Sequence, residues 1–107
     1  MYRVAREFDT FAVKLLPRRG CASLRDQLER ASSSIALNVA EGTGRFARLE
    51  KAHFYLIARG STMECAAVLD VALARGLVAE PAYHHGRGLL FRVAQMLTKL
   101  AQRMQTP

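Results

Sequence analysis

The stretch that decides the fold spans residues 24–42 and reads LRDQLERASSSIALNVAEG. Its apolar residues recur every three or four positions: Leu24, Leu28, Ala31, Ile35 and Val39. This period matches one face of an α-helix. No charged residue occurs from Ala31 to Ala40, so the helix is apolar or small on every side there. Such a helix is buried on more than one side, which favours neighbours within the chain and across a subunit interface. The alternative is a kinked helix that its own neighbours wrap.

The ends of this helix are also marked in the sequence. Ser23 precedes it and is a residue type that caps the first turn of a helix. We expect Gly42 to end the helix in the left-handed conformation that glycine adopts readily. Residues 43–46 then form a short connection.

Two neighbouring helices are predicted from the same period. The first ends at Pro17, because proline cannot continue a helix, and its apolar face comprises Val4, Phe8, Phe11 and Leu15. A long helix follows the connection from Arg48 to Arg75, and Gly76 closes it. Its apolar face is marked by Leu49, Leu56, Met63 and Ala67. Gly60 in its middle costs about 1 kcal/mol relative to alanine, which predicts that another backbone approaches there.

The last helix begins at Glu80, which we expect to be its cap, with Pro81 at the first helical position. Its apolar face comprises Leu89, Val93, Met96 or Leu97, Leu100 and Met104. No segment alternates with the period of a strand. Four amphipathic helices with short connections predict an all-α fold, an antiparallel up-down four-helix bundle that forms one domain over residues 1–107.

The composition excludes several classes of protein. Of the 107 residues 50% are hydrophobic and 23% charged, so the chain can bury a core and is not disordered. Cys21 and Cys65 are too few for a disulfide framework and have no metal-ligand spacing. The N-terminal residues lack the apolar segment of a signal peptide, and no uncharged run reaches the ~20 residues of a membrane span. We therefore expect a cytoplasmic protein with no membrane segment.

Polar residues on two of the helices are placed to meet. Asn38 and Glu41 share one side of their helix, and Ser61 and Glu64 share one side of the next helix. The pattern fits paired carboxylates for acid–base or metal chemistry, or a buried network that fixes the packing of helices or subunits.

Arg45 and Arg59 are the cations that could bind these carboxylates. Neither glutamate has the Glu-x-x-His spacing of bundle metal sites. His84 and His85 are adjacent and diverge, and the Cys65 thiol lies in an apolar stretch where it stays protonated. We therefore favour the structural network and predict no catalytic residue, no cofactor and no metal.

The charge of the chain points to polyanions. Sixteen basic residues against nine acidic ones give a formal net charge of +7. The candidates for nucleic-acid contact lie on one face of the last helix, one face of the first helix and the turn after it: Arg92, Lys99, Arg103, Arg3, Lys14, Arg18 and Arg19. Aromatic residues are not interleaved with them, so the pattern favours phosphate contact over base stacking. The alternative is an arginine-rich solvated surface with no ligand.

The central motifs resemble one small family. Ser34-Ile35, Asn38-Val39-Ala40-Glu41-Gly42 and Gly60-Ser61 with Glu64 resemble the signature of the 23S ribosomal RNA intervening-sequence proteins. The resemblance extends from the Gln27-Leu28 lead-in to the turn at residues 75–78. The chain differs from the family pattern at two positions. Ala47 replaces a serine that would cap the third helix, and Phe46 replaces a polar residue.

The resemblance implies an antiparallel four-helix protomer that assembles, as related bundles do, into five-membered rings. It also implies a link to nucleic-acid enzymes, because a related group is the accessory protein of diversity-generating retroelements, which works with a reverse transcriptase. The residues expected to carry assembly or the structural network are Ile35, Asn38, Glu41, Gly42, Arg45, Arg59, Gly60, Ser61 and Glu64.

Taken together, these patterns predict a non-enzymatic, basic homo-oligomer that contacts structured RNA or DNA through arginine and lysine. The alternative is a ring that binds other proteins and has no nucleic-acid ligand.

Overall fold

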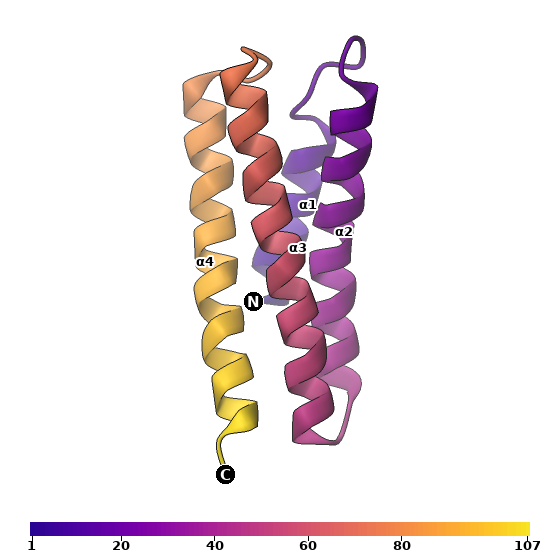
Figure 1. The fold of residues 1–107 in the computed structure, drawn as a ribbon, viewed down its shortest axis with the longest axis vertical. Coiled ribbons are helices and arrows are strands. Elements are labelled where there is room, and N and C mark those ends of the chain that lie inside the picture. The colour runs from indigo at the N-terminus through magenta and orange to yellow at the C-terminus, as the bar shows by residue number, and fades with distance from the viewer.

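The computed structural model describes all of residues 1–107 and contains four α-helices and no strand. Helix α1 spans Tyr2–Val13, α2 Ala22–Gly44, α3 Arg48–Ala74 and α4 Glu80–Gln105. The helices run alternately up and down, each packs against the next, and α1 closes against α4 (Figure 1). The predicted all-α, antiparallel four-helix arrangement is confirmed. None of the helices combines the length and the hydropathy needed to cross a membrane.

The end of α3 follows the sequence pattern. Gly76 has a φ of +72°, its N–H donates to the Leu73 carbonyl, and the Leu77 N–H donates to the Ala72 carbonyl at 2.9 Å. These two bonds satisfy carbonyls that the helix leaves open. Ala47 precedes α3 and makes no side-chain capping bond, as its replacement of a serine predicts.

The predicted end of α2 is wrong. Gly42 remains helical and lacks a positive φ, and α2 continues to Gly44. The Lys51 ammonium group explains the difference, because it donates to the carbonyl oxygens of Gly42 at 3.2 Å and Thr43 at 3.0 Å. A side chain from the next helix thus satisfies the last turn, which no longer needs a left-handed glycine.

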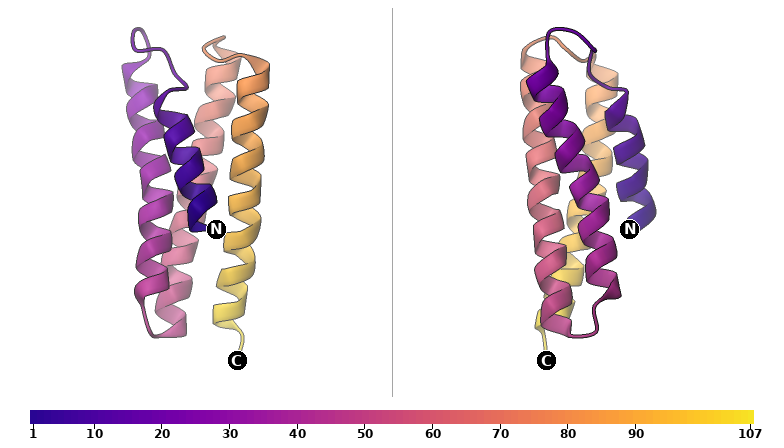
Figure 2. Two further views of the ribbon diagram at one scale, coloured as in Figure 1. Left: turned by 180° about the vertical axis from the view of Figure 1, so that it is seen from behind. Right: turned by 90° about the vertical axis from the view of Figure 1, so that its right-hand side faces the viewer.

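Three smaller boundaries also differ from the expectation. Cys21 rather than Ser23 precedes α2, and Ala79 rather than Glu80 precedes α4. Helix α1 ends at Val13, before Pro17 is reached. With 12 residues against 27 in α3, α1 begins about half-way along the bundle (Figure 2).

One continuous core fills the bundle. Phe8, Leu28, Ile35, Leu69 and Leu97 come from all four helices and are fully buried. The predicted face of α4 is confirmed, because Leu89, Val93 and Leu97 are buried and Met96, Leu100 and Met104 pack against the core.

The apolar face that the sequence marks on α3 does not face the core. Leu49, Leu56 and Met63 are 72%, 39% and 60% exposed, and Ala67 is also exposed. The inner side of α3 consists instead of Ala52, Tyr55, Ala58, Thr62, Cys65, Leu69 and Ala72. Small residues dominate that side, and they let α2 and α4 pack close to α3. Helix α3 therefore has two apolar sides, of which the protomer covers one.

Candidate functional site

Helix α1 sits tightly against α4 because α4 carries a glycine at the contact. A Cβ atom at Gly86 would lie 2.9 Å from the Phe11 ring and 2.9 Å from a methyl of Leu69. The edge of the Phe11 ring also meets the ring of His85, with centroids 5.1 Å apart. This contact identifies which sides of α1 and α4 face each other.

The predicted basic residues of these two helices lie on these adjoining sides. Arg92, Lys99 and Arg103 follow His85 at helical spacing, on the side of α4 toward α1. Lys14 follows Phe11 by three residues, and Arg3 lies on the same side of α1 as Lys14. Glu7 lies between those two and interrupts the row. The cations of α4 thus continue the side of that helix that carries His85, past the start of the shorter α1.

All seven predicted cations are exposed: Arg3, Lys14, Arg18, Arg19, Arg92, Lys99 and Arg103. We call this set the basic stripe. None of its members forms an ion pair, because the two ion pairs of the protein are Arg45–Glu41 and Arg87–Asp70. Arg18 and Arg19 lie in the α1–α2 turn at one end of the bundle, whereas Arg103 lies near the other end (Figure 1). The stripe therefore runs along most of a molecule that is 47 Å long.

The predicted polar network is divided into two parts. Ser34 and Ser61 share a hydrogen bond of 2.8 Å between α2 and α3, and the Asn38 amide donates to the Ser34 carbonyl at 2.9 Å and to its hydroxyl at 3.0 Å. This half-buried cluster fixes how the middle of α2 lies against α3. It joins Asn38 to Ser61 through Ser34, without either glutamate.

The charged members lie outside this cluster. The Arg45 guanidinium donates to Glu41 at 2.9 Å within one helical turn, and it lies 4.8 Å from the centre of the Phe54 ring. Arg59 and Glu64 are exposed and form no ion pair. The surface hollow that Glu41 lines does not include Glu64. The structure therefore does not bring the two carboxylates together.

Three further network residues are placed differently from the expectation. Ile35 is fully buried in the core of its own protomer. A Cβ atom at Gly42 would lie 2.7 Å from the Tyr55 ring, so this glycine serves the packing of α2 on α3. Gly60 is exposed, and a Cβ atom there would meet nothing within 4 Å. The close approach predicted at Gly60 is therefore wrong within the protomer.

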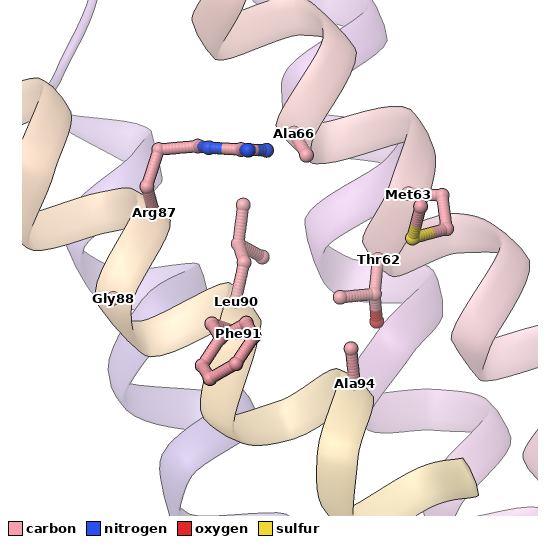
Figure 3. A pocket seen from close by; sticks show the side chains of 8 residues that line it. All are labelled: Thr62, Met63, Ala66, Arg87, Gly88, Leu90, Phe91 and Ala94. Atoms are coloured by element: carbon pink, nitrogen blue, oxygen red, sulfur yellow. The ribbon is translucent and has the colours of Figure 1, made fainter.

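The outer side of α3 borders an apolar groove. The groove between α3 and α4 has a volume of about 400 Å³ and is lined by Thr62, Met63, Ala66, Arg87, Gly88, Leu90, Phe91 and Ala94. Figure 3 shows Arg87 stretched above Leu90, with Met63 and Ala66 opposite on α3. Met63 and Phe91 are 60% and 64% exposed. Two large, exposed apolar side chains thus border this groove, Met63 from α3 and Phe91 from α4.

Two titratable groups have a raised pKa, and each rise has a local cause. Burial raises the pKa of the Cys65 thiol to about 12, and the charges of Glu64 and Asp9 add to the rise. The Tyr83 hydroxyl donates to Asp70 at 2.6 Å, which raises its pKa. No group of three or more histidine, cysteine, aspartate and glutamate side chains is close enough to hold a metal ion.

Arg25 makes a contact that no pattern in the sequence indicates. Its guanidinium donates to the carbonyl oxygen of Pro17 at 2.9 Å, across the α1–α2 turn. The two residues are eight positions apart. Only the path of the turn brings them together, so the helical periodicity of the sequence does not predict this contact.

A comparison with protein families finds one match. The family model described as 23S rRNA-intervening sequence protein matches residues 1–99, which cover all of the first three helices and most of α4. No curated protein matches the chain.

Proposed function

The chain belongs to the family of 23S rRNA-intervening sequence proteins, and from this premise we propose that it is a non-enzymatic, basic scaffold. Several copies assemble, and the assembly contacts structured RNA or DNA in the cytoplasm through phosphate-directed arginines and lysines. The assembly then presents the nucleic acid to, or works beside, a nucleic-acid enzyme.

The basic stripe is the observation that carries this proposal. Its seven cations are exposed and free of ion pairs, so their charge is not neutralised within the protein. They extend along a bundle 47 Å long. Duplex DNA carries about one charge per 1.7 Å of its axis, so an elongated stripe can face many phosphates at once. A small anion would need a compact site instead.

The outer side of α3 supports assembly. Leu49, Leu56 and Met63 are large, apolar and exposed, and Gly60 lies among them with open space beside it. Contiguous exposed apolar residues of this kind mark interaction surfaces. A small residue such as glycine lets another helix approach closely. We therefore assign this side of α3 to contacts between copies.

Assembly multiplies the charge. A five-membered ring, which the family resemblance implies, would carry a formal charge of +35, five times the +7 of one chain. Such a charge raises the local concentration of polyanions even without a shaped groove. Scaffold and nucleic-acid contact are thus parts of one proposal.

The test reverses charges inside and outside the stripe. We expect Arg92→Glu with Arg103→Glu to weaken the binding of structured RNA and duplex DNA by roughly tenfold or more and to flatten its salt dependence. Arg30→Glu with Arg75→Glu is the matched control, because both of its residues are exposed, outside the stripe and without an ion pair. Light scattering should give the same mass for both variants. Equal losses in the two variants would mean that only net charge matters, and the proposed surface would be wrong.

A protein ligand is the second candidate. The groove beside Met63 and Phe91 is the observation that favours it, because exposed aromatic and methionine side chains are common at protein interfaces. In that case the charge only keeps the protein soluble. Absence of RNA and DNA binding even at low salt would favour this candidate over the first.

A further inference from the structure

The α1–α2 turn borders an open hollow of about 660 Å³ whose lining includes basic residues from three segments. Its lining includes Lys14 just after α1, Arg18 in the turn and Arg25 in α2. Glu29 is the one carboxylate in its lining. Leu16, which is buried, contributes apolar surface. We call this feature the α1–α2 hollow.

Arg25 is held in place at this hollow. Its Nη1 donates to the Pro17 carbonyl oxygen at 2.9 Å, and the same oxygen accepts a bond from the Cys21 thiol at 3.0 Å. Arg25 is half-buried as a residue, and its bond to Pro17 restricts the side chain before any ligand arrives. Fixing a side chain in advance lowers the entropy that binding must remove. One bond to Pro17 still leaves four N–H groups of the guanidinium for other acceptors.

The charges of the hollow remain unpaired. Lys14, Arg18 and Arg25 form no ion pair, and Glu29 forms none either. Three cations against one carboxylate leave a net positive charge of two. The planar guanidinium groups of arginine match the oxygens of phosphate in paired hydrogen bonds. The hollow therefore has the charge and the donors that a phosphate group requires.

We propose that the α1–α2 hollow is a phosphate-binding site in which Lys14, Arg18 and Arg25 hold one phosphate group of a nucleic acid. This inference rests on the proposed function and deepens it, because the site lies at the end of the basic stripe that Lys14, Arg18 and Arg19 occupy. The rest of the stripe attracts the polyanion without fixing it. The hollow fixes where one phosphate sits, and so sets the position of the nucleic acid along the bundle.

The first experiment uses the unaltered protein and inorganic phosphate. Arginine Nε–H signals are followed by NMR as phosphate is added at constant ionic strength. We expect the Arg25 signal to shift and saturate while the signal of Arg75 stays in place. Arg75 is the control because it is exposed in the α3–α4 turn and forms no ion pair. Equal shifts of both signals, growing in proportion to phosphate, would overturn the proposal.

The second experiment compares Arg25→Gln with Arg75→Gln in binding to structured RNA. We expect Arg25→Gln to weaken binding about tenfold, and Arg75→Gln by no more than about twofold. RNA with a 5′ phosphate and RNA with a 5′ hydroxyl distinguish the source of the phosphate. If Arg25→Gln weakens the binding of both RNAs, a backbone phosphate occupies the hollow. If it weakens only the binding of the RNA with a 5′ phosphate, the end group occupies the hollow.

The two proposals fail in different ways. If the wild-type protein binds RNA and the two variants bind equally well, the hollow is not a phosphate site, whereas the proposed function stands. If inorganic phosphate saturates Arg25 but no nucleic acid binds, the proposed function fails, and the hollow binds phosphate but not as part of a nucleic acid. The NMR experiment needs no substitution, so loss of the Arg25–Pro17 bond in the variant cannot obscure the result.

Discussion

The inner and outer sides of α3 are both apolar, but they are built from different residues. The inner side is mostly small, with Ala58, Cys65 and Ala72 fully buried against the neighbouring helices. The outer side is large, with Leu49 and Met63 mostly exposed. Small residues allow α2 and α4 to approach, whereas large side chains leave substantial apolar area in water. Covering that area lowers the free energy by about 25 cal/mol for each Å² of apolar surface removed from water.

This difference shows what a helix gains from a second apolar side. One side is enough to join α3 to its own bundle, as α1 and α4 demonstrate with single apolar faces. A second apolar side on the same helix stabilises the protein only when something outside the protomer covers it. Substitutions on the inner side should therefore change the measured stability of the protein. Substitutions on the outer side should change its measured assembly.

The largest expected effect concerns the buried thiol on the inner side. The unfolded chain releases the Cys65 proton near its ordinary pKa of 9.0, whereas the folded protein keeps it until about pH 12. The unfolded state thus binds fewer protons than the folded state between these values, and the free energy of unfolding falls as the pH rises through them. The expected slope is at most about 1.4 kcal/mol per pH unit.

Urea unfolding at about pH 8 and about pH 10.5 measures this slope. The control is Cys65→Ala, which loses stability at neutral pH because it leaves a small cavity but lacks the thiol's contribution to the slope. The difference in slope between the two proteins isolates the thiol from other groups that titrate in this range. Identical slopes would mean that Cys65 is not buried as described.

A pair of glycine substitutions compares contacts at the two sides of α3, because Gly42 lies on α2 and faces Tyr55 on the inner side, whereas Gly60 lies on the outer side. We expect Gly42→Ala to cost about 1–3 kcal/mol more than Gly60→Ala. The added methyl at Gly42 would lie 2.7 Å from the Tyr55 ring and 3.3 Å from the Lys51 carbonyl, whereas the methyl at Gly60 meets nothing within 4 Å. Both substitutions add an alanine to a helix, which by itself is worth up to about 1 kcal/mol.

Urea unfolding of the two variants at a dilution that separates the subunits gives this difference. Gly60→Ala should then be neutral or slightly stabilising, while at higher concentration it should weaken assembly by filling the space between helices of different copies. Equal destabilisation by both substitutions would remove the distinction between the inner and the outer side of α3.

The sequence predicts the four helices because each has a clear helical period, but it misplaces the end of α2 and several caps. It does not decide which side of α3 is inside. Leu49, Leu56 and Met63 recur at helical spacing, and so do Ala58, Cys65 and Leu69. Both sets satisfy the same pattern. Only packing decides between them, and it favours the small residues where α2 and α4 must approach closely.

The contacts that the sequence did not predict share one physical cause. Gly42 has the appearance of a terminal glycine, but Lys51 on the next helix satisfies the last carbonyls of α2. Likewise, Arg25 reaches Pro17 only because of the path of the turn. The Glu41–Arg45 pair lies within one helical turn and was open to prediction. Contacts between segments depend on how helices dock, and a single sequence does not contain that information in its periodicity.

The mass of the protein in solution tests the central claim most directly. At micromolar concentration, light scattering should give the wild-type protein a mass at least twice the 11.9 kDa of one chain. A variant with Leu56→Glu and Met63→Glu should keep its helical circular dichroism, because both residues are on the outer side, and should give about 11.9 kDa. A wild-type mass of 11.9 kDa would contradict the account, because the outer side of α3 would then remain uncovered.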